Sequence, residues 1–193
     1  MKDKILIALD VSSRNEALTM VEQLHDLCGM FKVGGQLFMA AGPSIVSEII
    51  SRGGRVFLDL KFHDIPNTVE HAVVEAAKLG VSMMTIHAAG GRAVMTAVSE
   101  ALAKDFASNR PIVVAVTVLT SFDAAMLAEI GVPGALPDQV RRLALLAEDC
   151  GINGCVCSPL EISMVRQAVK PAFKIVTPGI RLAGQSLNDQ QRI

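Results

Sequence analysis

Aromatic residues are scarce in this sequence of 193 residues, which contains no tryptophan, no tyrosine and seven phenylalanines. Proteins that bind single strands without sequence preference stack the bases on aromatic side chains, so a platform of that kind is not expected. The formal net charge is −1, which gives no electrostatic reason to expect binding to nucleic acid or to an anionic membrane. No apolar run reaches the ~18 residues that a membrane-spanning helix needs.

Cysteine is also sparse, and the spacing of the four cysteines matches no zinc framework. Cys155 and Cys157 lie in an apolar run, where we expect them to behave as small buried hydrophobic residues. The apolar run near the N-terminus, residues 5–9, is too short for a secretory signal and ends at Asp10. These features predict a protein of the reducing cytoplasm with free thiols.

Short apolar segments alternate with amphipathic segments along the whole chain. Seven strands are predicted, at residues 5–9, 30–33, 55–60, 82–86, 111–116, 154–157 and 173–176. Helices are predicted at residues 14–27, 43–51, 65–79, 91–104, 138–150 and 160–168. Several of the strands are continuously apolar, as in a parallel sheet that is buried on both faces. The chain is therefore expected to form a single domain of repeated βα units over residues 1–193.

Polar residues at the ends of the predicted strands distinguish a barrel from an open sheet. An open doubly wound sheet binds its ligand at one switch point, whereas a barrel collects residues from nearly every strand end at one mouth. No glycine-rich dinucleotide motif follows the first strand, where Asp10 begins the sequence Asp-Val-Ser-Ser. The pattern predicts an α/β protein with the (β/α)8 TIM barrel fold. The polar residues at or just past the strand ends are Asp10, Lys32, Asp59, Lys61, His87, Thr117, Thr120 and Arg181.

Residues 59–68, with the sequence Asp-Leu-Lys-Phe-His-Asp-Ile-Pro-Asn-Thr, hold the densest group of charged and polar side chains. Alternate residues of a strand share a face, so Asp59 and Lys61 should point the same way. Asp64 should open the next helix, with Thr68 over the same face. A purely structural alternative makes Asp64 an N-cap, with proline in the first helical turn, and makes Asp59 and Lys61 a solvated ion pair.

Six motifs stand in order along the whole chain, and together they resemble the orotidine 5′-phosphate decarboxylase family. The Asp-x-Lys-x-x-Asp core occurs more widely among barrels of the same superfamily, whereas its extension through Ile-Pro-Asn-Thr, together with Thr-Pro-Gly-Ile-Arg, is more specific. The motifs are residues 8–10 (Ala-Leu-Asp), 32–34 (Lys-Val-Gly), 59–68, 87–91 (His-Ala-Ala-Gly-Gly), 119–121 (Leu-Thr-Ser) and 177–181 (Thr-Pro-Gly-Ile-Arg).

The resemblance implies loss of CO2 from C6 of orotidine 5′-monophosphate, giving UMP in pyrimidine biosynthesis, with no metal and no organic cofactor. Lys61 would stabilise the negative charge that develops at C6 and supply the proton. Nearby carboxylates favour the charged ammonium, and Lys32, Asp59, Lys61 and Asp64 would form an array with zero net charge.

The other site residues also follow from the resemblance. Asp10 and Lys32 would hold the ribose hydroxyls, and Thr120 would meet the pyrimidine edge. Arg181 and Gln190 would reach the phosphate, which suits the guanidinium fork of arginine. The predicted substrate site is Asp10, Lys32, Asp59, Lys61, Asp64, Ile65, Thr68, Thr120, Pro178, Arg181 and Gln190.

The resemblance further implies a homodimer with shared active sites, because in the family Asp64 and Thr68 enter the site of the other subunit. Family members that resemble this chain continue with another helix, an eighth strand that carries a phosphate-binding Gly-Arg pair, and a final helix. We therefore expect seven of the eight strands here, in a barrel domain that is incomplete at its C-terminus.

Two other functions remain open. A metal-dependent sugar-phosphate decarboxylase or aldolase of the same superfamily would share Asp59, Lys61 and Asp64, but residues 65–68 argue against it. The chain could instead be a non-catalytic nucleotide-binding fragment.

The long connection at residues 117–137 is expected to be a lid with a short helix in its middle.

Overall fold

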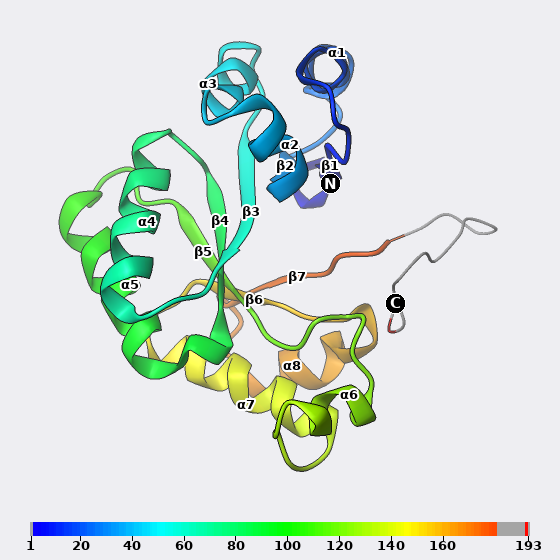
Figure 1. The fold of residues 1–193 in the computed structure, drawn as a ribbon, viewed down its shortest axis with the longest axis vertical. Coiled ribbons are helices and arrows are strands. Elements are labelled where there is room, and N and C mark those ends of the chain that lie inside the picture. The colour runs from blue at the N-terminus through cyan, green and yellow to red at the C-terminus, as the bar shows by residue number, and fades with distance from the viewer. Residues whose placement is uncertain (1, 181–191, 193) are drawn as a thin grey trace.

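The computed structural model describes residues 2–180 and 192, and its centre is a sheet of seven parallel strands (Figure 1). Each strand pairs with the next one along the chain, in the order β1-β2-β3-β4-β5-β6-β7. The sheet curls as the wall of a (β/α) barrel does, which confirms the predicted fold class. The strands are β1 (Leu6–Ala8), β2 (Met30–Gly34), β3 (Val56–Phe62), β4 (Met83–His87), β5 (Ile112–Val116), β6 (Gly154–Val156) and β7 (Lys174–Val176).

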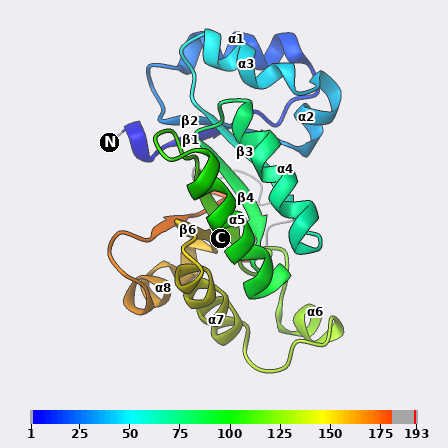
Figure 2. The ribbon, with the colours of Figure 1, turned by 90° about the vertical axis from the view of Figure 1, so that its left-hand side faces the viewer.

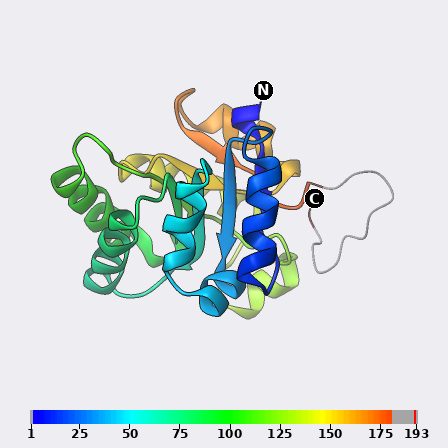
Figure 3. The same cartoon turned by 90° about the horizontal axis from the view of Figure 1, so that it is seen from above.

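The helices lie on the outer side of the curled sheet (Figures 2 and 3). In the part of the chain that the structure describes, none of them is long and apolar enough to cross a membrane. They are α1 (Arg14–Leu24), α2 (Gly35–Ala41), α3 (Ser44–Ser51), α4 (Pro66–Lys78), α5 (Gly91–Asp105), α6 (Ala124–Glu129), α7 (Leu136–Asp149) and α8 (Ile162–Ala168), with short 3-10 turns η1 (Lys2–Lys4), η2 (Ala88–Gly90) and η3 (Pro159–Glu161).

Most predicted elements appear within a few residues of their expected bounds, and α6 confirms the short helix expected inside the long connection after β5. Helix α2 was not predicted, because its first residue, Gly35, follows another glycine and the pair is typical of a turn. Leu37, which is fully buried, ties this helix to the core and offsets the low helix propensity of glycine.

The two faces of the sheet have different neighbours. The outer face packs against the helices in the main apolar core, to which Val56 and Leu58 of β3 belong. A smaller apolar cluster on the inner face contains Phe57, with Met30 and Met83 from the neighbouring strands. Because alternate residues share a face, the residues of β3 that follow Phe57 at a spacing of two point into the curl.

The sheet has two open edges within the described residues, since β1 pairs only with β2 and β7 pairs only with β6. Both outer strands therefore keep one backbone edge unpaired in this part of the chain.

Cys155 and Cys157 are buried, as predicted, and Cys28 and Cys150 are also free and buried. A hydrogen bond with Cys157, together with burial, raises the pKa of the Cys155 thiol well above its ordinary value. That thiol is therefore protonated at neutral pH and chemically inert.

Candidate active site

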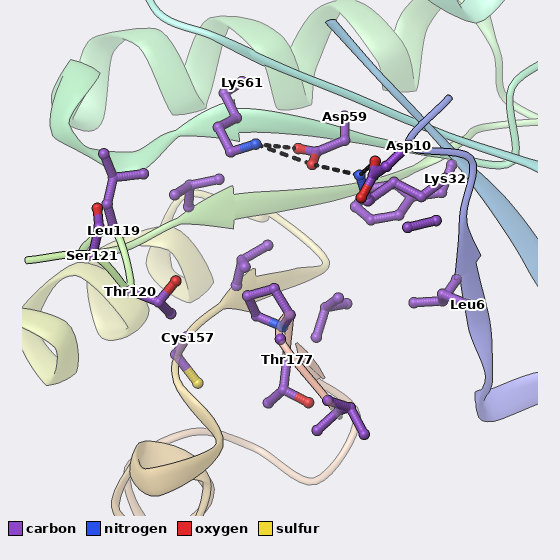
Figure 4. A pocket seen from close by; sticks show the side chains of 18 of the residues that line it. Leu6, Asp10, Lys32, Asp59, Lys61, Leu119, Thr120, Ser121, Cys157 and Thr177 are labelled. Atoms are coloured by element: carbon purple, nitrogen blue, oxygen red, sulfur yellow. Dashed lines mark hydrogen bonds and ion pairs between the residues drawn. The ribbon is translucent and has the colours of Figure 1, made fainter. Parts of the chain in front are cut away.

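A cavity of about 570 Å³ opens on the inner face of the sheet, at the carboxyl ends of its strands (Figure 4). This is the end at which barrels of this type place their functional residues. Its described lining includes side chains from or just after β1, β2, β3, β5, β6 and β7. Six predicted site residues line it: Asp10, Lys32, Asp59, Lys61, Thr120 and Pro178.

Four of these side chains form a row of alternating charge along one wall (Figure 4). The Lys61 Nζ lies 3.0 Å from both carboxylate oxygens of Asp59. The Lys32 Nζ lies 3.9 Å from Asp59 Oδ2 and 3.0 Å from Asp10 Oδ1. The side chain of Asp59 is only 14% exposed, whereas that of Asp10 is 68% exposed. The row has zero net charge, and its buried member lies between the two ammonium groups.

The backbone of β3 is irregular at Lys61. Leu58 pairs with Met84 and Phe62 pairs with Ile86, so three residues of β3 lie opposite one residue of β4. Lys61 has φ of 50°, the only positive value at a non-glycine position in the described residues. A left-handed conformation costs about 1–2 kcal/mol in a residue with a Cβ. Strained residues of this kind concentrate at functional sites, and here the strain lies at the predicted catalytic lysine.

Thr85 on β4 is a site residue that the sequence reasoning missed. Its side chain is 1% exposed, and its Oγ1 accepts a hydrogen bond of 2.8 Å from the Lys61 backbone N–H. The same hydroxyl donates to Asp59 Oδ1 over 3.1 Å. The available signal was a lone polar residue inside the otherwise apolar run Met-Met-Thr-Ile, on the strand next to the one that carries Asp59 and Lys61.

Within one chain, the later residues of the motif at 59–68 lie away from the charged row. Asp64, Ile65 and Thr68 are exposed at the start of α4, and the described cavity lining does not include them. Helix α4 begins at Pro66 with Ile65 as its N-cap, so the structure corrects the expectation that Asp64 caps or opens this helix. Its Oδ1 accepts instead from the Ile65 N–H at 2.6 Å, which stabilises the turn before the helix.

Within one chain, the charged row therefore differs from the predicted array of Lys32, Asp59, Lys61 and Asp64. Asp64 makes no ion pair with any residue that the structure describes, and Asp10 provides the second carboxylate of the row instead. The alternating order of Lys32, Asp59 and Lys61 is as predicted. An intersubunit role for Asp64 stays a prediction.

His87 lies at the carboxyl end of β4 and takes part in local contacts. Its Nδ1 accepts a hydrogen bond of 3.4 Å from the Ala89 N–H, and its ring stacks on that of His63 at 4.8 Å. Burial, then the nearby His63 and Lys61, lowers the pKa of His87 to about 4. The ring is thus neutral at pH 7. The described residues contain no group of three or more His, Cys, Asp or Glu side chains that could hold a metal ion.

Opposite the charged row, the loop after β5 carries Thr120, which is 8% exposed. Arg192 holds this loop, because its guanidinium donates to the carbonyl oxygens of Val118, Leu119 and Phe122. The same guanidinium pairs with Glu161, whose other carboxylate oxygen accepts from a backbone N–H at the start of η3. The two residues predicted at the phosphate, Arg181 and Gln190, lie outside the described residues.

The comparisons with known proteins agree on one family. Residues 3–193 match the model of the family described as "Orotidine 5'-phosphate decarboxylase / HUMPS family". The chain is 53% identical to the orotidine 5′-phosphate decarboxylase of Syntrophomonas wolfei and 49% identical to that of Moorella thermoacetica. Both matches cover 100% of this chain, and they cover 82% and 78% of those two proteins.

Among solved structures, the chain is similar to the orotidine 5′-phosphate decarboxylase of Lactobacillus acidophilus. The TM-score is 0.84 and the identity is 36%, and the match covers 92% of this chain and 81% of that one.

Proposed function

Because the chain belongs to the orotidine 5′-phosphate decarboxylase / HUMPS family, we propose that it is a carboxy-lyase that converts orotidine 5′-monophosphate to UMP in pyrimidine biosynthesis. The observation that carries this proposal is the Lys61–Asp59 pair, held at 3.0 Å in an open cavity at the carboxyl ends of the strands. Such a pair offers a charged ammonium to a carbon that becomes negative during the reaction.

In the proposed reaction, the bond between C6 and the carboxylate breaks, and CO2 leaves. The electron pair of that bond stays on C6, where the Lys61 ammonium stabilises it and then transfers a proton from Nζ. The products are UMP and CO2, and water returns a proton to the neutral lysine. This role requires a lysine that is charged when substrate is bound, which the bidentate contact with Asp59 favours.

Asp59 would act on the substrate as well as on Lys61. In the proposed pose it faces the substrate carboxylate, and like charges 4 Å apart repel by about 4 kcal/mol at an effective dielectric constant of 20. The repulsion disappears when CO2 departs. The burial of Asp59 supports this role, because little water is present to screen it.

The remaining residues would bind the rest of the nucleotide. Asp10 and Lys32, paired at 3.0 Å, would hold the ribose hydroxyls. Thr120 would meet the pyrimidine edge, and Pro178 lines the cavity after β7. Arg181 and Gln190 would bind the phosphate, and the loop that carries Thr120 would close over the site as a lid.

We also propose a homodimer with shared sites. Asp64, Ile65 and Thr68 are exposed together at the start of α4, and the Ile65 side chain is 66% exposed. A second copy of the chain would bury this apolar side chain and bring Asp64 to the cavity of its partner. The open edges of β1 and β7 support a further proposal, an eighth strand between them that would complete the barrel.

A turnover assay with orotidine 5′-monophosphate, run with and without EDTA, tests the function. We propose that no metal or organic cofactor takes part, so the rate should be unchanged after EDTA treatment and dialysis. No turnover of orotidine 5′-monophosphate, together with Mg²⁺-dependent turnover of a sugar phosphate, would favour a metal-dependent sugar-phosphate enzyme of the same superfamily. Binding of UMP without turnover would indicate a nucleotide-binding protein.

The free buried cysteines fit a reducing compartment, and we propose the cytoplasm.

A further inference from the structure

We propose that Thr85 is a positioning residue of the decarboxylation site, whose buried hydroxyl fixes the Lys61 backbone and the Asp59 carboxylate relative to each other. This inference rests on the proposed function, because it takes the Lys61 Nζ as the group that meets C6. Thr85 itself does not line the described part of the cavity, so it would act through Lys61 and Asp59.

The direction of both hydrogen bonds is fixed by chemistry. A backbone N–H can only donate, so the Thr85 Oγ1 must accept from Lys61 at 2.8 Å. An ionised carboxylate can only accept, so the single hydroxyl proton must point to Asp59 Oδ1 at 3.1 Å. The same Oδ1 also accepts from the Lys61 Nζ at 3.0 Å. The Thr85 hydroxyl thus links the Lys61 backbone to Asp59, which is also the hydrogen-bond acceptor of the Lys61 side chain.

The irregular pairing of β3 explains why a side chain is needed here. The extra residues of β3 interrupt the backbone ladder with β4 at this point. The Lys61 N–H faces β4 there and donates to the Thr85 hydroxyl. Because Thr85 is 1% exposed, water has no room to substitute for it. The bond also holds Lys61 at φ of 50°, from which the backbone would otherwise relax.

Removal of the hydroxyl should therefore misplace the lysine without removing it. Thr85→Val keeps the shape of the side chain and deletes both hydrogen bonds, whereas Thr85→Ser keeps the hydroxyl. Thr117→Val is a matched control, since Thr117 is 2% exposed and its hydroxyl donates to the Val156 carbonyl at 2.8 Å. All three variants are made in the full chain and compared with wild type by circular dichroism before kinetics.

The split between kcat and KM separates positioning from a general loss of structure. We expect kcat to fall about 100-fold in Thr85→Val, the scale on which small misplacements of catalytic groups act, with KM within about 3-fold of wild type. Thr85→Ser and Thr117→Val should stay within about 5-fold of the wild-type kcat. A kcat in folded Thr85→Val within about 5-fold of wild type, or an equal loss in Thr117→Val, would overturn the proposal.

Amide hydrogen exchange in the wild-type protein provides a second test that needs no variant and no turnover. The Lys61 amide should exchange at least ~100-fold more slowly than an unprotected amide, because Thr85 accepts its proton in a buried place. Exchange at the unprotected rate would overturn the proposal even if the chain is an active decarboxylase. Slow exchange in a protein without decarboxylase activity would support the hydrogen bond and reject the proposed function alone.

Discussion

Asp59 is the residue on which the charged wall of the site depends. It accepts two hydrogen bonds from Lys61 and one from the Thr85 hydroxyl, and it lies near Lys32. Its side chain is only 14% exposed. A carboxylate with this many donors needs no water to satisfy its oxygens. The geometry therefore places a hydrogen-bonded carboxylate at the position where the proposed reaction brings the substrate carboxylate.

At the same scale, His87 predicts how stability should depend on pH. Its pKa is about 4 in the folded protein, lowered mainly by burial, and 6.5 is the ordinary value. Between these values the unfolded chain binds the proton and the folded protein does not, so stability should fall as the pH drops from about 6.5 toward 4. Urea unfolding of wild type, His87→Gln and the exposed control His71→Gln at pH 7.5 and 5.0 measures this.

Only His87→Gln should lose part of the decrease in unfolding free energy between the two pH values. His71 lies on the exposed side of α4, so its replacement should leave the decrease as it is in wild type. Equal decreases in all three proteins would show that His87 takes up its proton in the folded state.

Among the elements, β3 shows what the sequence could predict and what it could not. Its apolar start and the alternation of Asp59 and Lys61 are local patterns, and they predict that both side chains share one face, which is the inner face of the sheet. The irregular pairing with β4 is a property of two strands that are distant in sequence. The role of Thr85 depends on that pairing, so no pattern within β3 could reveal it.

The same limit applies to α2 and to α4. Helix α2 is stabilised by tertiary burial of Leu37 that outweighs its glycine start, and local propensity does not include that burial. For α4, a proline at the first helical turn was correctly expected, but the preceding residue must be extended, so the N-cap falls on Ile65 and not on Asp64. Local sequence therefore predicts that helix α4 exists, and the backbone restriction before Pro66 determines where it begins.

The ion pair between Glu161 of η3 and Arg192 predicts a contribution to the stability of the protein. Glu161 is 6% exposed and pairs with Arg192, which in turn holds three carbonyl oxygens of the loop after β5. Loss of one partner of a buried pair costs roughly 3–5 kcal/mol, so Glu161→Gln should lower the free energy of unfolding by an amount near the bottom of that range. Urea denaturation at constant pH measures it.

The control for this prediction is Glu75→Gln, which removes the carboxylate of an exposed pair with Lys78. A surface pair of this kind contributes less than about 1 kcal/mol. If the two variants were equally stable, the Glu161–Arg192 contact would not hold the loop in solution.

At the scale of the whole molecule, the exposed position of Asp64 predicts complementation between two inactive proteins. In the proposed homodimer, each site of Lys61→Ala lacks its lysine, and each site of Asp64→Ala lacks the carboxylate that the partner would supply. A mixed dimer has one site that carries neither change, so an exchanged equimolar mixture should recover roughly a quarter of wild-type activity. Steady-state turnover before and after subunit exchange measures the recovery.

A fluorescence assay with labelled subunits shows whether exchange takes place. Complete exchange with no recovered activity would mean that Asp64 acts within its own subunit, or not at all. Activity in unmixed Asp64→Ala at the wild-type level would remove Asp64 from the site.

The most direct measurement of the central claim is the kcat of Lys61→Ala with orotidine 5′-monophosphate. The Lys61 side chain is 42% exposed at the edge of the cavity, so its removal should leave the circular dichroism spectrum and UMP binding close to those of wild type. Decarboxylation should become undetectable, because neither the charge at C6 nor the proton has another source in the row. A variant that keeps more than about a tenth of the wild-type kcat, a barrier change of only ~1.4 kcal/mol, would contradict the assignment of Lys61 as the proton donor.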